Sequence, residues 1–364
     1  MSVKAKSIPN NPAVIAINQT LVKWDNTQRL KIYYKLAALL RNRFTVMDAL
    51  DRIWDIESKD GKKPDEPFAI AVASWLHELE KGFSFSSAID GWAPAREQLM
   101  LSVGDASKLE KALLNLIKVS EGSNKIIAPL KNAITYPLVM ICLCFLIIVG
   151  VGLYMVPPMM EIVEGAKFTG VAGSLQWLSE FTKDYWFMVP IGLFTLITII
   201  TISLPNWTGK IRVLFDKFPP WSLYRMFTGV SWLLSVSALI ESGTPIVKGL
   251  QSLRTNSTPY LRERIDAVLR YMNNGASFGG ALKMSGMGFP DPEIVGDLEI
   301  YSELDGFEES LQQVADEYLE ESIKNINAQA QMLNSFAMLL VSIVIAWTLF
   351  GVFEMQNQVQ KAMS

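Results

Sequence analysis

Residues Asn132–Met160 read NAITYPLVMICLCFLIIVGVGLYMVPPMM, and this stretch, which contains no charged residue, decides the architecture of the chain. An α-helix rises about 1.5 Å per residue, so about 20 apolar residues cross the roughly 30 Å hydrocarbon core of a bilayer. Two other uncharged stretches, Tyr185–Gly209 and Asn325–Phe353, have the same character. We therefore predict three membrane-spanning helices, at residues 132–156, 185–204 and 334–353.

The composition of the chain leaves room for soluble domains beside these spans. It has 364 residues, of which 50% are hydrophobic and 19% are charged. This charge is too high for a protein buried wholly in lipid and suits two polar domains of about 100 residues each. The net charge of −3 does not favour a general attraction to nucleic acid. We recognise no cleavable signal peptide, because the apolar run Ala13–Ile17 is too short for one.

The lysines and arginines near the spans indicate the orientation in the membrane, because cytoplasmic loops carry an excess of these residues. Lys118, Lys125 and Lys131 precede the first span, and Lys210, Arg212, Lys217 and Arg225 follow the second. The connection 157–184 has only two lysines, and the tail 354–364 has one. We therefore expect the N-terminal segment 1–28 and the domains 29–131 and 205–333 in the cytoplasm. The connection and the tail should lie outside.

The two cytoplasmic domains resemble each other. Three pairs of segments align in the same order: AALLRNRFTVMDAL (Ala37–Leu50) with SALIESGTPIVKGL (Ser237–Leu250), GFSFSSAI (Gly82–Ile89) with GASFGGAL (Gly275–Leu282), and Pro94–Leu113 with Pro292–Leu311. Continuing the last alignment places the first span on the third. Two copies in one orientation need a return crossing, which the second span supplies. The repeat therefore supports the same three-span topology independently of charge.

Both domains show helical periodicity. Apolar residues recur at helical spacing in each copy, and no convincing run alternates as a strand would. Gly82 and Gly275 stand where one helix would end before the next begins, and Asp291-Pro292 is typical of a helix start. We predict an all-α membrane protein with two repeated cytoplasmic helical bundles and three transmembrane helices.

The segments that enter the spans differ in composition. Leu319–Ser335 contains neither proline nor glycine, so a continuous helix is expected there. Gly122 and Pro129 predict a kink or break before the first span, and Pro190 predicts a kink in the second. Cys142 and Cys144 lie two residues apart on a helix and point to different faces, which favours simple packing over a disulfide or metal pair.

No convincing catalytic, cofactor or metal site is present in the sequence. A phosphate-binding GxxxxGK[ST] loop is absent, and the only histidine, His77, lies in HELE rather than in HExxH. Gly275–Gly279 matches the letters of a GxSxG nucleophile motif around Ser277, but between helices rather than after a strand. An acidic cluster could bind a cation, although a solvated helix face explains it as well; its members are Glu293, Asp297, Glu299, Glu303, Asp305, Glu308 and Glu309.

Two other classes of function remain open at this point. An oligomeric membrane channel or transporter would need a polar lining, for which the candidates are Thr195, Thr198, Thr201, Ser203, Ser342 and Thr348. A membrane hydrolase would have to use Ser277 or His77. The spans contain no Asp, Glu, Lys, Arg or His, and ion-coupled carriers usually place such groups at membrane depth.

Taken together, these features resemble the inner-membrane platform proteins of type IV pilus and type II secretion systems. The residues that carry the resemblance lie at the turns of both copies, in the element after Pro292 and at the head of the first span: Gly82, Asp105, Pro137, Gly243, Pro245, Gly275, Glu303 and Gly306. The chain departs from the family pattern at Arg43-Phe44-Thr45, where a Gly-x-Pro turn is usual, and at Lys108, where glycine is usual. These departures suggest a divergent subgroup such as bundle-forming or plasmid thin pili.

The resemblance implies a role without catalysis. Such a protein sits in the bacterial inner membrane with its N-terminus in the cytoplasm and its C-terminus in the periplasm. It couples a cytoplasmic hexameric ATPase to the insertion of pilin or pseudopilin subunits into a filament. The implied partners also include inner-membrane alignment-complex proteins, membrane lipid and further copies of the chain, and no cofactor is implied.

Overall fold

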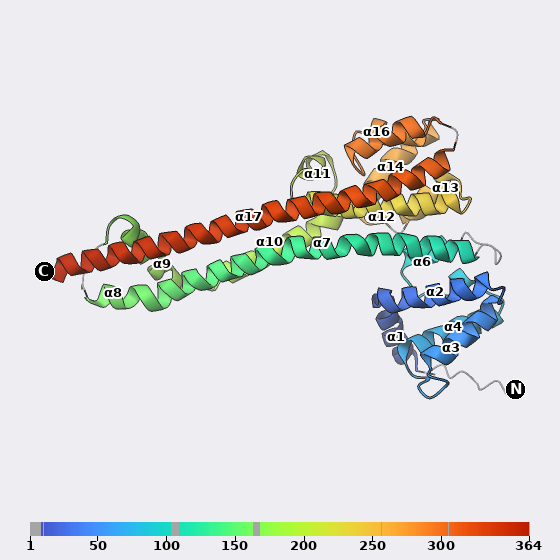
Figure 1. Cartoon of the computed structure of the whole chain (residues 1–364), viewed down its shortest axis with the longest axis horizontal. Coiled ribbons are helices and arrows are strands. Elements are labelled where there is room, and N and C mark those ends of the chain that lie inside the picture. The colour runs from blue at the N-terminus through green and yellow to red at the C-terminus, as the bar shows by residue number, and fades with distance from the viewer. Residues whose placement is uncertain are drawn as a thin grey trace. The chain divides into compact units, whose positions relative to one another are not determined.

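A computed structural model describes residues 9, 11–102, 109–162, 168–255, 257–304 and 306–363. Every regular element in these ranges is a helix (Figure 1), which confirms the predicted all-α fold. The helices form two compact units: Met1–Lys125 with Asn206–Glu320, and Ile126–Pro205 with Glu321–Ser364. The first unit therefore holds most of the two domains that the sequence predicts to be cytoplasmic, and the second holds the three predicted spans.

The two domains of the first unit are built from parallel series of helices. The first series is α1 (Pro12–Trp24), α2 (Asn26–Arg41), α3 (Val46–Glu57), α4 (Pro67–Glu80), α5 (Phe85–Ala88) and α6 (Ala95–Ser102). The second series is α11 (Lys210–Phe215), α12 (Trp221–Glu241), α13 (Ile246–Thr255), α14 (Pro259–Asn273), α15 (Phe278–Ser285) and α16 (Pro292–Tyr301). Helices α2 to α6 thus correspond in order to α12 to α16.

Local sequence signals explain where these helices begin. Thr45, Ser84, Ser277 and Asp291 each accept a hydrogen bond from a backbone N–H in the first turn of the helix that follows. Such caps satisfy donors that the helix itself leaves unpaired. Proline occupies an early position in four helices, α1, α4, α14 and α16, where its missing N–H costs nothing. The predicted start of α16 at Asp291-Pro292 is confirmed.

A long helix follows each series. Helix α7 covers Leu109–Gly150 and is continued by a π-helical segment, Val151–Met155, and by α8, Val156–Ile162. Helix α17 covers Phe307–Met363, so residues 354–363 of the predicted tail are its last part. Leu109 and Phe307 are equivalent in the repeat alignment, which means that both long helices begin at the same place in their copies.

The expected break in the first long helix is wrong, whereas a kink there stays a prediction. Pro129 and Pro137 lie inside α7, and the helix continues through them and through Gly122. Neighbouring groups in a membrane or bundle can accommodate the hydrogen bonds that a proline removes. The predicted continuity of 319–335 is confirmed, because these residues all belong to α17.

Four helical segments of the described chain are long and apolar enough to cross a membrane by length and composition: Leu109–Ile162, Met188–Asn206, Trp221–Glu241 and Glu309–Met363. They differ in how much of their most apolar window is buried within the protein, which is 17%, 0%, 83% and 28% respectively. The third is α12, whose apolar side chains form the core of the first unit. Its apolarity is therefore explained by protein packing, and the other three overlap the spans that the sequence predicts.

Helices α9 (Gly170–Tyr185) and α10 (Met188–Asn206) belong to the second unit. Pro190 lies in the first turn of α10, where the helix has no hydrogen bond for proline to remove. The predicted kink at Pro190 is therefore wrong, because the helix starts there instead of bending. The connection before α10 is itself largely helical, since α8 and α9 account for most of residues 157–184 that the structure describes.

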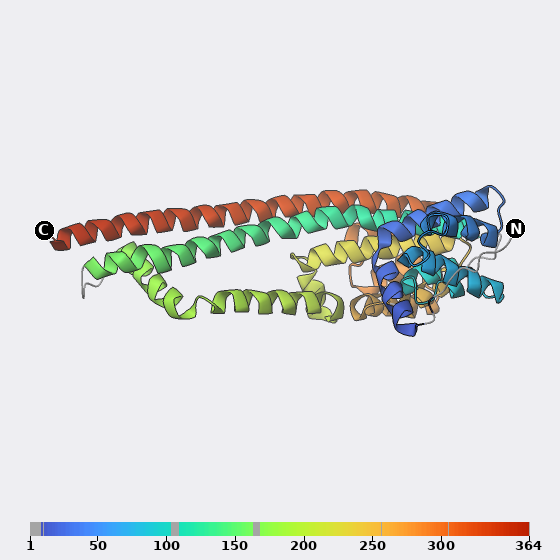
Figure 2. The same cartoon turned by 90° about the horizontal axis from the view of Figure 1, so that it is seen from below.

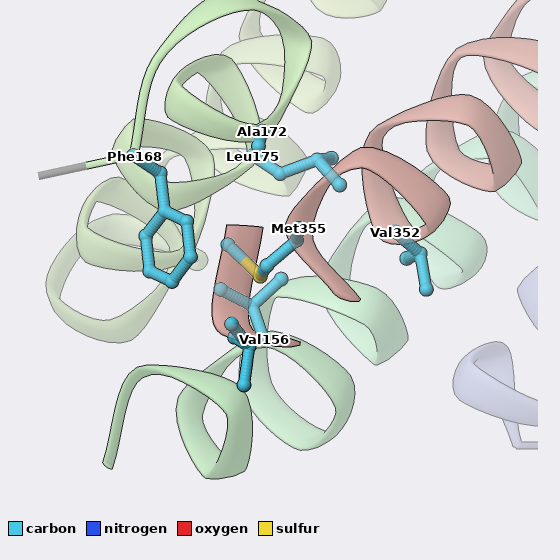
Figure 3. Close-up of a cluster of buried hydrophobic side chains, with 7 residues drawn as sticks. Val156, Phe168, Ala172, Leu175, Val352 and Met355 are labelled. Atoms are coloured by element: carbon cyan, nitrogen blue, oxygen red, sulfur yellow. The ribbon is translucent and has the colours of Figure 1, made fainter. Parts of the chain in front are cut away.

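One end of the second unit has a small apolar core of its own (Figure 3). It joins α8, α9 and the last turns of α17, and its members are Val156, Phe168, Ala172, Leu175, Val352, Met355 and Val359. Glu354 accepts a hydrogen bond from the N–H of Ala172 at 3.0 Å, near the start of α9. A carboxylate at this position pairs an otherwise free donor and opposes the positive end of the helix dipole. The connection and the tail are thus packed together.

Candidate functional site: the seam between the repeats

The two repeats meet where α7, α12 and α17 run side by side in the first unit (Figure 2). We call this contact region the seam and define it by Asn115, Lys118, Gly122 and Ser123 of α7 with the residues that they touch. The Asn115 amide donates to the Ala238 carbonyl at 3.3 Å, and Ser123 and Ser231 are 3.1 Å apart. Each of these bonds joins the long helix of the first repeat to the central helix of the second.

The same region also links the two long helices directly. Lys118 on α7 forms an ion pair with Asp316 on α17, with 2.8 Å between the nitrogen and the oxygen. Both side chains are about half exposed, so the pair adds little stability by itself. Helix α12 is tied to α17 as well, because the Ser237 hydroxyl donates to Gln312 at 2.6 Å.

Gly122 is the point of closest approach in the seam. A Cβ atom at this position would lie 2.7 Å from a Leu234 methyl on α12 and 3.3 Å from a Leu319 methyl on α17. Real Cβ atoms do not come that close to other heavy atoms, so a larger residue would require the Leu234 side chain to move and the packing around it to change. Glycine is weakly disfavoured inside a helix, and its place in α7 is explained by this contact.

Away from the seam, the first repeat contains a buried ion pair between α2 and α6. Arg29 of α2 donates two hydrogen bonds to the carboxylate of Glu97 on α6, at 2.7 and 2.6 Å. Tyr33 donates to the same carboxylate at 2.9 Å. Burial raises the pKa of the Tyr33 phenol well above its ordinary value, and the negative charge of Glu97 adds to this. Burial opposes the charge on Arg29, but Glu97 outweighs it and raises the pKa of the guanidinium.

The second repeat has a larger buried cluster, at a different place in its series. Asp216, at the end of α11, lies between Arg212 and Arg264, and all three side chains are almost fully buried. Tyr260 of α14 also donates to Asp216, at 3.2 Å, and the Arg264 guanidinium lies 3.5 Å over the Tyr260 ring. Burial is the main cause that raises the pKa of Tyr260 far above its ordinary value. This cluster fastens α11, which follows the second span, to α14.

The signature glycines close turns. Gly82, Gly243 and Gly275 have φ angles of +88°, +83° and +91°, and a Cβ at any of them would meet nothing within 4 Å. They are therefore required by backbone conformation and not by packing. Arg43, which is equivalent to Gly243, also takes a positive φ, of 64°. The departure from the family pattern at Arg43 thus keeps the same turn with a less suitable residue.

The other signature residues lie at separate places. Pro245 directly precedes α13, and Gly306, with a φ of +81°, precedes α17. Glu303 is exposed in the turn after α16, and Pro137 lies inside α7. Asp105 is outside the described residues. The signature residues thus mark helix ends and one long helix, and the structure does not bring them together around a ligand.

The residues considered for chemistry have structural partners. The Ser277 hydroxyl accepts from the N–H of Gly280 at 3.2 Å as the cap of α15, and from Ser302 at 3.1 Å. His77 is exposed on α4, 3.9 Å from Glu80. In the acidic cluster, Glu299 pairs with Lys283 at 2.7 Å. Within the described ranges, no group of three or more His, Cys, Asp or Glu side chains is arranged to hold a metal ion.

The hydroxyl groups considered for a channel lining bond within their own helices. Thr195, Thr198 and Thr201 donate to carbonyls four residues earlier in α10, at 2.8 to 2.9 Å. Within α17, Ser342 donates to the carbonyl of Met338, four residues earlier, and Thr348 donates to that of Ile345, three residues earlier. These groups are thereby satisfied in an apolar environment, so the structure offers no specific support for a polar pore.

The sequence matches a family model twice. The model of type II secretion system (T2SS), protein F, covers residues 32–157 and again residues 232–354. The chain belongs to this family. The first match runs from within α2 to residue 157 in α8, and the second runs from within α12 to residue 354 in α17. Each match thus includes one copy and its long helix, which confirms the internal repeat. Membership of the protein F family, together with the apolar helices, indicates a protein of the inner membrane and of pilus or secretion machinery.

Curated relatives support the same conclusion. The toxin coregulated pilus biosynthesis protein E of Vibrio cholerae serotype O1 is 22% identical over 338 residues, which are 92% of this chain and 98% of the relative. The protein transport protein HofC homolog of Escherichia coli is 22% identical, over 75% of this chain and 68% of its own length. The type IV pilus assembly protein PilC of Myxococcus xanthus is 23% identical, over 76% of this chain and 68% of its own length. The predicted resemblance to platform proteins is thereby confirmed.

Sequence reasoning missed the seam and both buried charge clusters. Gly122 gave a signal, but its position in a helix suggested a break instead of a close contact. Arg29 and Glu97 are 68 residues apart, and nothing in their local sequence pairs them. The signal for this pair would have been a charged residue at a position of α2, and another in α6, where the helical pattern calls for an apolar side chain.

Proposed function

We propose that this protein F family member is a non-enzymatic assembly platform that couples a cytoplasmic hexameric ATPase to the insertion of pilin or pseudopilin subunits into a filament. The observation that carries the proposal is the continuity of the two long helices. Helix α7 contains residues of the seam and also the first uncharged apolar stretch. Helix α17 contains residues that contact the seam and also the third uncharged apolar stretch. A displacement of the cytoplasmic repeats would therefore reach the membrane through unbroken helices.

The contacts in the seam are the physical basis of this proposed coupling. Because α12 contacts α7 and α17 at once, a force on either repeat is shared by both long helices. Closely packed interfaces transmit displacement because they have low compressibility. The proposed partners are the ATPase on the cytoplasmic side, pilin and alignment-complex proteins at the membrane, and membrane lipid around the spans.

The three-span topology is part of the proposal, with the N-terminus in the cytoplasm and the C-terminus in the periplasm. The aromatic rings on α9 support it. Trp177, Phe181 and Tyr185 form a ladder with ring centroids 5.6 Å apart, and Trp177 is 65% exposed. Aromatic side chains of this kind gather at membrane–water interfaces, and this ladder ends three residues before α10 begins.

The decisive experiment interrupts α17 between the seam and the membrane. Four glycine and serine residues inserted after Lys324 should abolish filament formation while the protein remains in the membrane at its normal amount. The matched control places the same insertion after Lys62, in the exposed turn between α3 and α4, and should keep filaments. Normal filaments from the Lys324 insertion would refute mechanical coupling through α17.

A further inference from the structure

Helix α11 is a short helix with two different faces. It begins at Lys210, four residues after α10 ends at Asn206. One face carries Arg212 and Asp216, which are buried in the charge cluster that fastens this helix to α14. The helix is thus held to the second repeat by that face, and its opposite face is presented outward.

The outward face consists of large apolar side chains. Ile211, Leu214, Phe215 and Phe218 are 65%, 57%, 37% and 59% exposed, and their spacing is that of one apolar stripe on a helix. Phe218 lies just beyond the end of α11, but its N–H donates to the carbonyl of Phe215 at 2.9 Å, so the chain keeps its helical course that far. We call these four residues the α11 face.

The exposed charge beside the α11 face is positive. Lys210 and Lys217 are both exposed, and their separation of seven residues places them on the same side of the helix, along one border of the face. The other charged residues in 207–221 are the two buried in the cluster. Glu263 of α14 reaches the start of α11, where its carboxylate accepts a hydrogen bond from a backbone N–H at 3.0 Å and lies 3.6 Å from Arg264.

The length of α10 indicates where α11 lies relative to the bilayer. Helix α10 has 19 residues, which rise about 28 Å at about 1.5 Å per residue and so match the roughly 30 Å of hydrocarbon. None of its most apolar window is buried within the protein. When α10 crosses the membrane, Asn206 lies at the boundary of the hydrocarbon. Four residues reach at most about 14 Å, so α11 has to begin in or beside the headgroup layer.

Aromatic rings gather at the same level. The ring of Phe215 lies 5.1 Å from that of Trp207 and 5.1 Å from that of Trp221, measured between centroids. The two tryptophan rings are 6.1 Å apart. Tryptophan is enriched at membrane–water interfaces, and here it packs the segment between α10 and α11 against the α11 face.

We propose that the α11 face lies in the headgroup layer of the membrane and binds anionic phospholipid. Its apolar side chains would contact the upper acyl chains, as in other interfacial helices, and Lys210 and Lys217 would bind the phosphates. The lysines favour anionic over zwitterionic lipid. Because the buried cluster fastens α11 to α14, this contact holds the second repeat at the membrane surface. The proposal rests on α10 as a span, which is part of the proposed topology.

The test measures depth in the bilayer for the full chain reconstituted in vesicles, with Cys142 and Cys144 changed to serine. A fluorophore on Leu214→Cys should be quenched several-fold more by lipid spin-labelled near the headgroup than by lipid spin-labelled deep in the acyl chains. Leu196→Cys, at a 54% exposed site in α10, should show the opposite order. The matched control is Ile300→Cys, 63% exposed on α16 of the same repeat, which should not be quenched by either lipid.

The charge of the lipid is varied in the same assay. Adding phosphatidylglycerol to phosphatidylcholine vesicles should increase the shallow quenching at Leu214→Cys several-fold. Lys210→Gln combined with Lys217→Gln should remove most of this increase. Lys248→Gln combined with Arg270→Gln, at exposed sites elsewhere in the second repeat, is the matched control and should keep it.

Three results would overturn the proposal while leaving the topology intact. With Leu196 quenched, absence of quenching at Leu214 would show that α11 lies off the membrane. Quenching that ignores phosphatidylglycerol or the two lysines would refute binding of anionic lipid. A photo-cross-linker at Leu214 that captures a protein in the cell membrane would assign the face to that protein. Absence of quenching at Leu196 would overturn α10 as a span, and with it both the proposed topology and this proposal.

Discussion

Helices α2 and α12 occupy equivalent places in the two repeats, but they are buried to very different extents. Six of the 16 residues of α2 are buried, compared with 16 of the 21 residues of α12. The reason is the seam, because α12 is covered by its own repeat on one side and by α7 on another. The second repeat is thus central and the first peripheral, and the equivalent helix of the first repeat is more exposed.

The two repeats also differ in the buried ion pairs that they contain. The first has one bidentate pair, Arg29 with Glu97, and the second has Asp216 between two arginines. Buried pairs of this kind are costly to break, because the remaining charge is left without compensation. The comparison between the repeats can therefore be tested by removing one carboxylate charge from each.

The largest effect is expected from Asp216→Asn. This change leaves Arg212 and Arg264 buried with no full negative charge between them, and a loss of about 3–5 kcal/mol in the free energy of unfolding is typical of such a site. Glu97→Gln leaves a single uncompensated arginine and should cost less. The measurement is the thermal unfolding midpoint of the purified full chain in detergent.

Glu299→Gln is the control for these two changes. It removes a carboxylate that is paired with Lys283 at an exposed site, so its effect should stay within about 1 kcal/mol. Equal midpoints for Asp216→Asn and Glu299→Gln would contradict the claim that the cluster of the second repeat fastens α11 to α14.

The next largest effect on stability is expected at Gly122, where α7 packs closely against α12. Gly122→Leu places a side chain where Leu234 and Leu319 already lie, and overpacking of this kind costs about 1–3 kcal/mol. It should lower the unfolding midpoint and reduce filament formation. Gly150→Leu is the matched control on the same helix, since a Cβ there meets nothing within 4 Å. If both variants behave alike, Gly122 is not a point of close contact.

The sequence predicted much of the fold but little of the seam. Uncharged stretches, turn glycines and the repeat alignment are local or periodic signals, and they indicated the long apolar helices, the turns and the corresponding helices. Gly122 shows why the contacts of the seam could not be predicted. A glycine can mark a helix break or a close helix contact, and which of the two depends on residues that are distant in the sequence. Pro129 and Pro190 likewise suggested interruptions, but the first is accommodated inside α7 and the second lies at a helix start.

A smaller effect tests the equivalence of Arg43 and Gly243. Gly243→Ala puts a Cβ on a residue with a φ of +83° and should cost about 1 kcal/mol. Gly249→Ala, in helical conformation within α13, is the control and should stabilise by about 0.5–1 kcal/mol. Arg43→Gly should change stability by less than either, because relief of the left-handed conformation is offset by a more flexible unfolded chain. Differential scanning fluorimetry of the three variants would check this order.

The smallest expected effect at neutral pH comes from the titration of the buried tyrosines. Each repeat contains one such tyrosine, so the two repeats should contribute equally. Burial raises the folded-state pKa of Tyr33 and of Tyr260 above the value of about 10 that a tyrosine has in the unfolded chain. Below that pH both states keep the proton, so stability does not depend on either residue. Above it the unfolded state releases protons that the folded state retains, and stability falls as the pH rises, by at most about 1.4 kcal/mol per pH unit for each tyrosine.

Thermal midpoints measured between pH 8 and pH 11 should therefore be flat up to about pH 10 and then decline. Tyr33→Phe should make the decline shallower, and Tyr260→Phe should do so by a similar amount, because each repeat contributes one such phenol. Tyr154→Phe, at an 80% exposed site, is the control and should leave the slope unchanged. A slope that responds to Tyr260 but not to Tyr33 would mean that the first repeat opens before the second, and the two repeats would then differ in stability as well as in burial.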